Sequence, residues 1–101
     1  GKIRDGGRQV ALLKNGTIYK GSSASSSKLL AMTKADKIYS TSYASSSKCI
    51  GLVKRGTIYN RATASSSYKV GTTKDAEKVI LGRCSEVELG AIYILMKSGK
   101  I

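Results

Sequence analysis

One 20-residue unit is repeated through the middle of this chain. The tetrapeptide Ala-Ser-Ser-Ser occurs at 24–27, 44–47 and 64–67, and the pair Ile-Tyr occurs at 18–19, 38–39 and 58–59. Lysines keep the same spacing, at Lys14, Lys34, Lys54 and Lys74. A unit this short cannot bury its apolar face alone, so the repetition predicts an architecture in which neighbouring units stack on one another.

Each unit is typical of a β-hairpin. Strand-like segments occur at 28–34, 48–54 and 68–74, and the segment 17–20 and its copies supply the second strand of each unit. Asn15-Gly16 lies between two such strands and is a strong hairpin signal, because a type I′ turn needs positive φ at both central residues. Ala35-Asp36 and Arg55-Gly56 take the same place in later units, and the Ser-rich stretches form the opposite connections.

Strand alternation gives an expectation for the core, because successive side chains point to opposite faces. We expect the column Val10, Leu30, Ile50 and Val70 and the column Leu12, Met32, Leu52 and Thr72 to join Ile18, Ile38 and Ile58 in the core. The small residues Ala31, Gly51 and Gly71 then form a thin opposite face, open to close approach by another element. Cys49 is expected on that less buried face.

The two ends of the chain depart from the repeat. Ile3-Arg4 resembles the Ile-Tyr strand, with a tight turn at Asp5-Gly6-Gly7 in place of a Ser-rich loop, and residues 78–81 begin a fifth unit that does not complete. A helix is predicted over about 85–98, because Ser85 and Glu88 form a capping-box pattern and Gly99 offers a C-terminal stop. This helix is apolar on nearly all sides, so it must be buried by the sheet or by a second subunit.

The predicted fold class is therefore all-β: an antiparallel hairpin-repeat meander of about eight or nine strands, curled or closed into a small barrel, with one C-terminal helix. Residues 1–101 form a single repeat domain, with hairpin repeats over about 2–83 and the capping helix over about 85–98.

The formal net charge is +12, and the repeats carry most of it. Residues 1–71 hold thirteen lysines and arginines against Asp5 and Asp36, a net charge of +11. Such a field attracts polyanions such as nucleic acid and makes their binding salt-dependent. The alternative is that positive charge only keeps the sheet soluble and its edge strands unpaired.

The candidate polyanion-binding residues are the periodic lysines, two further cations and a ladder of tyrosines. Aromatic and basic side chains together suit single-stranded nucleic acid, although tyrosine in neighbouring strands also stabilises a sheet by cross-strand packing alone. These residues are Lys14, Lys34, Lys54, Lys74, Lys20, Arg61, Tyr19, Tyr39 and Tyr59.

Catalysis is not expected. The chain has no His to act as base or metal ligand, only six carboxylates, and no Gly-rich phosphate motif, so we expect no catalytic residue, no metal and no cofactor. Cys49 and Cys84 are too few for a disulfide framework and are expected to be free thiols in a bacterial or phage-like cytoplasm, with one bridge in an exported protein as the alternative. The sequence has no window of 18 apolar residues, so no transmembrane helix is expected.

The unit Ile18-Tyr19-Lys20-Gly21-Ser22, its copies and the segment 85–96 resemble small bacterial tandem-repeat proteins with hairpin units of similar length and a terminal apolar helix. The resemblance covers residues 9–98. The chain is more weakly similar to MORN repeats, but Gly21 is replaced by Thr41 and Arg61 in later units. Neither resemblance supplies a catalytic or binding residue.

Two functional hypotheses follow. The first is a non-catalytic, strongly basic binding module that engages a polyanion, with nucleic acid as the foremost partner. The second is a structural protein that self-associates into a homo-oligomer through its helix and one sheet face.

Overall fold

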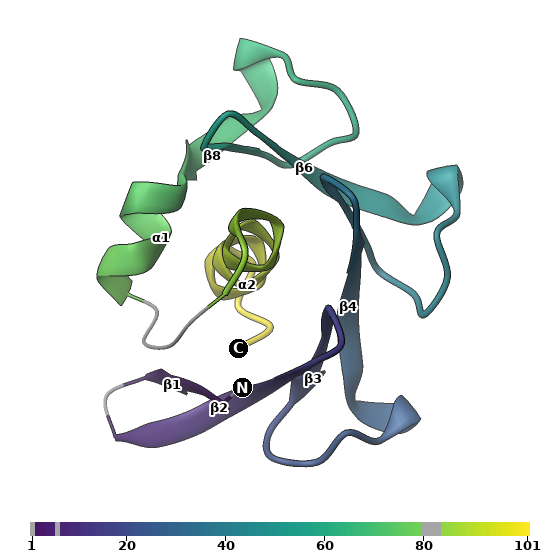
Figure 1. Ribbon diagram of the computed structural model, residues 1–101, viewed down its shortest axis with the longest axis vertical. Helices are drawn as coiled ribbons and strands as arrows, with labels where there is room; N and C mark the ends of the chain where they lie inside the picture. Colours follow the sequence, from purple (N-terminus) through teal and green to yellow (C-terminus); the bar gives the residue numbers. More distant parts are fainter. Residues whose placement is uncertain (1, 6, 80–83) are drawn as a thin grey trace.

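The computed structural model describes residues 2–5, 7–79 and 84–101 and shows one open sheet of eight antiparallel strands, followed by two helices (Figure 1). The strands are β1 (Lys2–Asp5), β2 (Arg8–Lys14), β3 (Thr17–Lys20), β4 (Leu29–Lys34), β5 (Lys37–Tyr39), β6 (Cys49–Lys54), β7 (Thr57–Tyr59) and β8 (Lys69–Thr72). The helices are α1 (Thr73–Val79) and α2 (Glu86–Lys97). Strand order in the sheet follows the sequence, so the predicted meander is confirmed, with the sheet curled rather than closed.

The hairpin turns and the Ser-rich connections recur in each unit. Asn15-Gly16 and Arg55-Gly56 have positive φ at both positions, as a type I′ turn requires, whereas in the Ala35-Asp36 turn only Ala35 has a positive φ, at 56°. Each Ser-rich stretch ends in a short 3₁₀ helix: η1 (Ser26–Lys28), η2 (Ser46–Lys48) and η3 (Ser66–Tyr68). These connections project outward from the sheet as three arms (Figure 1).

Helix α2 lies inside the curl of the sheet (Figure 1) and packs against β4, β5, β6 and α1. The predicted capping box is present: the Ser85 hydroxyl accepts from the Glu88 backbone N–H, and the Glu88 carboxylate accepts from the Ser85 N–H. Gly99, with φ 77°, ends the helix, and the backbone N–H groups of Gly99 and Lys100 donate to the carbonyls of Met96 and Leu95. Leu89, Ile92 and Leu95 are buried, as an all-round apolar helix requires.

The small-residue column faces this helix, which corrects part of the predicted core. Ile18, Ile38 and Ile58 are fully buried as expected, but their cross-strand partners on the inner face are Ala31, Gly51 and Gly71. A Cβ added at Gly51 would lie 2.5 Å from Ile94 Cδ1, and one at Gly71 would lie 2.7 Å from the Tyr93 ring. The predicted thin face is therefore the inner face, and its missing side chains leave room for α2.

The predicted column Leu12, Met32, Leu52 and Thr72 lies on the outer face, so its assignment to the core alongside the isoleucines was wrong. Leu12, Met32 and Leu52 pair there with Tyr19, Tyr39 and Tyr59, although Leu52 is nonetheless buried, with 5% of its surface exposed. Cys49 is half-buried on this outer face, paired with Tyr39, so it does not share the face of Ala31, Gly51 and Gly71 on which it was expected, because the bulge at Ile50 separates it from Gly51.

A β-bulge in every unit explains the error. Ile3 pairs with Ala11 but Arg4 pairs with Gln9, so Val10 is the extra residue. The same skip occurs where β3, β5 and β7 meet the next strand, and leaves Leu30, Ile50 and Val70 without a partner. These four bulge residues are partly buried against the core, as their column was expected to be. A bulge adds twist and bends the strand, so a bulge in each unit helps the sheet to curl.

The strand register is also staggered. Lys14 pairs with Thr17, and Thr17 pairs with Met32, so Lys14 is level with Met32 rather than with Lys34. Each unit is thus displaced by two residues, about 6.8 Å along the strand, relative to the one before it. A stagger of this kind accompanies strand tilt in barrels and is consistent with the curl seen here.

Helix α1 was not predicted. The expected strand over 68–74 ends at Thr72, and the start of a fifth unit at 78–79 is helical, whereas residues 80 and 81 lie outside the described residues. The Asp75 carboxylate accepts from the Thr72 backbone N–H at 3.0 Å, and the Thr72 hydroxyl accepts from the Asp75 N–H at 3.2 Å. This second capping box starts α1, which lies across the opening between β8 and β1 (Figure 1).

Candidate polyanion-binding surface

The curled sheet has two rims. The hairpin turns at 15–16, 35–36 and 55–56 form one rim, here called the turn end. The arms, the start of β2 and the C-terminus of α2 form the other, here called the loop end, because Gly99 and Lys100 lie beside Lys20 and Gly21, and Ser98 lies beside Asn60. The N-terminal half of α2 lies towards the turn end, where a Cβ on Gly90 would overlap Val53 Cγ2.

The described lysines and arginines on both rims form no ion pairs with described carboxylate side chains. All seventeen lysines and arginines of the described part of the chain are exposed. None of them has a carboxylate oxygen of a described Asp or Glu side chain within 4.0 Å. Ion pairs among the described side chains therefore do not offset this positive charge, and it remains available to an anionic partner.

The periodic lysines lie at the turn end. Lys14, Lys34 and Lys54 each end a strand before a hairpin turn, whereas Lys74 lies in the first turn of α1. A spacing of two strands alone separates equivalent residues by about 9.6 Å, but the two-residue stagger raises this to about 12 Å. That separation exceeds the Debye length of about 8 Å at physiological salt. The lysines also sit on the outside of a curved sheet, so they diverge rather than line one groove.

The predicted tyrosine ladder is a packed feature of the outer face. Tyr19 pairs with Leu12 and Leu29, and Tyr39 pairs with Met32 and Cys49. Tyr39 is only 9% exposed, so it offers little ring surface for a base to stack upon. Cross-strand packing of this kind stabilises a sheet without any ligand.

The loop end brings together two of the predicted residues and several that the sequence did not single out. Lys20 ends β3, and Arg61 lies 5.5 Å above the Tyr68 ring in the third arm. Tyr43, in the second arm, is 58% exposed and is an aromatic side chain free to stack. The cations at this end are Arg8, Lys20, Lys28, Lys48, Arg61, Lys69, Lys97 and Lys100.

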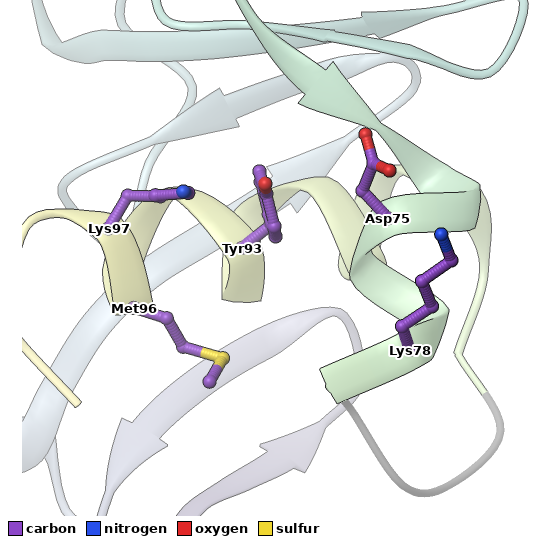
Figure 2. A pocket seen from close by; sticks show the side chains of 5 residues that line it. All are labelled: Asp75, Lys78, Tyr93, Met96 and Lys97. Carbon is purple, nitrogen blue, oxygen red and sulfur yellow. The ribbon is translucent and has the colours of Figure 1, made fainter.

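Three shallow hollows surround the C-terminal half of α2. The hollow of about 320 Å³ between α1 and α2 is lined by Asp75, Lys78, Tyr93, Met96 and Lys97 (Figure 2). A second, of about 340 Å³, includes Arg8, Lys20 and Lys100, and a third, of about 260 Å³, includes Asn60 and Lys97. Of the lysines and arginines that the sequence suggested as a site, only Lys20 lines one of these hollows.

The hollow in Figure 2 is lined by two lysines, one carboxylate, and the side chains of Tyr93 and Met96. The Lys97 amine lies 5.4 Å from the centre of the Tyr93 ring, and Lys78 and Asp75 project from α1 (Figure 2). The carboxylate is engaged locally: the Thr72 backbone N–H, followed by the Thr72 hydroxyl, holds the pKa of Asp75 below its ordinary value. The arrangement suits contact with an anionic or aromatic group.

Other chemistries find little support in the described residues. Cys49 and Cys84 are free, and burial, helped by the Glu88 carboxylate, raises the pKa of the Cys84 thiol, which disfavours a reactive thiolate. Among residues 2–5, 7–79 and 84–101 there is no cluster of three or more metal-ligand side chains. Neither described helix has the length and apolarity needed to cross a membrane.

Comparisons with protein-family models, with curated proteins and with solved structures find no match to this chain.

Proposed function

We propose that this protein is a non-catalytic basic module that binds a polyanion, nucleic acid foremost, with its loop end. The observation that carries the proposal is the exposure of every described lysine and arginine without an ion-pair partner. A surface of this kind gains affinity by releasing counterions from a phosphate backbone. The loop end is favoured over the turn end because it adds concave hollows and the exposed ring of Tyr43.

The acids also favour the loop end. Asp36 lies in a hairpin turn, and Glu86 and Glu88 lie in the first turn of α2, so these three carboxylates oppose the turn-end lysines. At the loop end, Asp5 ends β1, and Asp75 lines the hollow beside Lys97, where its carboxylate accepts from the Thr72 backbone N–H. Of these acids, three belong to the turn end and two to the loop end, so fewer carboxylates offset the cations of the loop end.

Self-association through α2 and the sheet face, the other hypothesis, stays a prediction. The helix that motivated it is buried within its own sheet, so a shared interface would have to use another surface. Sedimentation equilibrium over a wide concentration range tests it directly.

A salt titration tests the binding proposal. Affinity for a labelled 20-nucleotide single strand and for a 20-base-pair duplex is measured by fluorescence anisotropy between 50 and 200 mM KCl, about the range over which phosphate contacts weaken most visibly. Binding should weaken with log salt at about 0.9 per phosphate contact on the duplex and about 0.7 on the single strand. Absence of salt-dependent binding to either would refute the proposal.

Two variants of equal charge loss locate the surface. The loop-end variant replaces Lys20, Lys28, Lys48 and Arg61 with Gln, and the turn-end variant replaces Lys14, Lys34, Lys54 and Lys74 with Gln. The loop-end variant should lower the slope by up to about 0.9 per lost contact on duplex DNA, and the turn-end variant should lower it less. A larger loss in the turn-end variant would assign binding to the periodic lysines instead.

A further inference from the structure

The hollow beside Gly21 gathers positive charge from three separate parts of the chain. Arg8 begins β2, Lys20 ends β3, and Lys100 follows α2, and all three line one hollow of about 340 Å³. No acidic side chain is among the described residues that line it. Its volume is at the lower end of the range for small-molecule sites. Like charges brought to one concavity repel one another, and a bound anion relieves that repulsion.

The first repeat differs from its copies at this position. Gly21 corresponds to Thr41 and Arg61 in the later units, so only here is the side chain missing. Gly21 has a φ of 83°, and a Cβ built on it would meet no atom within 4 Å, so the position faces open space. The short connection between β1 and β2, where later units carry a Ser-rich arm, further uncovers the start of β2.

The hollow is preformed. The Gly21 N–H donates to the Val10 carbonyl at 3.0 Å, and the Gln9 side-chain amide donates to the Gly21 carbonyl at 3.1 Å. These bonds fix the backbone at the base of the site. Val10 and Ile101 add apolar surface beside the cations, and both pack partly against the core.

The dipole of α2 is a weak explanation for this cluster. Three carbonyls of its last turn accept backbone hydrogen bonds: Ile94 from the Ser98 N–H, Leu95 from the Lys100 N–H, and Met96 from the Gly99 N–H. Arg8 and Lys20 belong to the sheet, so pairing with a helix end is not what places them there.

We infer that this hollow binds a terminal phosphate monoester carried on a nucleoside. This inference rests on the proposed function and specifies which part of the polyanion the hollow binds, namely the phosphorylated end of a strand. A phosphate monoester is close to a dianion at neutral pH and offers three terminal oxygens. One guanidinium fork and two ammonium groups suit that acceptor set better than they suit a single carboxylate. The apolar surface of Val10 and Ile101 is available to the attached sugar or base. A free nucleotide and the phosphorylated end of a strand share this chemistry.

The test compares ten-nucleotide oligothymidylates that end in a 5′-phosphate, a 3′-phosphate or hydroxyls only, at one salt concentration, with the full chain. At least one phosphorylated strand should bind about tenfold more tightly than the hydroxyl-ended strand. If free nucleotides also bind in the hollow, an excess of adenosine monophosphate should abolish this preference. If adenosine monophosphate does not compete, the hollow binds phosphorylated strand ends and not free nucleotides.

Three variants separate the hollow from general charge. Replacing Arg8, Lys20 and Lys100 with Gln should abolish the phosphate-end preference, whereas the matched replacement of Lys14, Lys34 and Lys54 should retain it. Gly21→Asn keeps the net charge, tolerates the left-handed backbone better than other side chains, and fills the hollow, so it should abolish the preference while preserving salt-dependent binding. Thermal melts verify that each variant is folded.

The outcomes separate the two proposals. If the wild type binds phosphate-ended and hydroxyl-ended strands with equal affinity while salt-dependent binding is intact, the proposal that the hollow binds a terminal phosphate is refuted. The proposed function is then unaffected. Equal loss of the preference in both charge variants likewise refutes the proposal for the hollow. Binding of adenosine monophosphate that shifts the Gly21 and Gly99 amide resonances, with no binding of any strand, supports the hollow and refutes the proposed function.

Discussion

Gly51→Ala tests the close approach of α2 to the sheet. The added Cβ would lie 2.5 Å from Ile94 Cδ1, 2.9 Å from the Tyr59 carbonyl oxygen and 3.2 Å from Ile38 Cδ1, whereas carbon atoms in contact prefer about 3.5 to 4.0 Å. Overpacking of this kind costs about 1 to 3 kcal/mol, and replacing Gly by Ala in a strand returns about 0.5 to 1 kcal/mol. We expect a net loss of about 1 to 2 kcal/mol.

Thermal and urea denaturation measure the effect. For a domain of this size each 1 kcal/mol lowers Tm by about 4 to 8 °C, and the urea m-value should not change. Gly7→Ala is the matched control, because a Cβ there meets nothing within 4 Å; its stability should stay within about 0.5 kcal/mol of the wild type.

A double-mutant cycle identifies the cause. Ile94→Val removes the atom nearest to the new Cβ and costs about 0.5 to 1.5 kcal/mol alone. Combined with Gly51→Ala it should cost about 1 kcal/mol less than the sum of the two, without full rescue, because the Tyr59 carbonyl remains. A Gly51→Ala protein as stable as the wild type, or strict additivity of the pair, would refute the placement of α2 against β6.

Three further predictions concern the core, a turn and a cap. Ile38→Asp places an unpaired charge at a fully buried site and should abolish cooperative unfolding at pH 7. The control Ile38→Val should lower the free energy of unfolding by only about 0.5 to 1.5 kcal/mol. A cooperative melt of the Asp variant near the wild-type midpoint would contradict the assignment of Ile38 to the core. Ala35→Asn should raise the free energy of unfolding by about 0.5 to 1 kcal/mol, since Ala35 has a φ of 56° and Asn tolerates this left-handed conformation better than Ala. Asn15→Ala, at the equivalent position of the first hairpin turn, should lower the free energy of unfolding in the same denaturation assay. The folded-state pKa of Asp75 is lowered, so its contribution to stability is present above the ordinary pKa of 3.8 and is lost as pH falls through the folded value. Urea titrations should therefore find Asp75→Asn less stable than the wild type at pH 6, with a gap that closes on acidification; a gap independent of pH would contradict the capping role.

The cationic hollow could not be predicted from the sequence. Arg8, Lys20 and Lys100 are far apart in the chain and share no spacing, so no pattern connects them until α2 enters the sheet. The periodic lysines were conspicuous because duplication repeats every residue, whether or not it has a use. For α1, a signal was available: Thr72 and Asp75 form a capping-box pattern, but the repeat register favoured another strand there.

Local sequence determined the hairpins, their turns and the cap of α2, because alternation, positive φ at Asn15-Gly16 and the Ser85–Glu88 pair act over a few residues. Tertiary structure decided which face is buried. Residues 10–13 are all apolar, so alternation alone could not choose between the two faces. The choice depends on a bulge at Val10 and its equivalents, and on the room that Ala31, Gly51 and Gly71 leave for a helix that follows them in the chain. Both are long-range packing effects, because each lowers the free energy only when the sheet and α2 are assembled together.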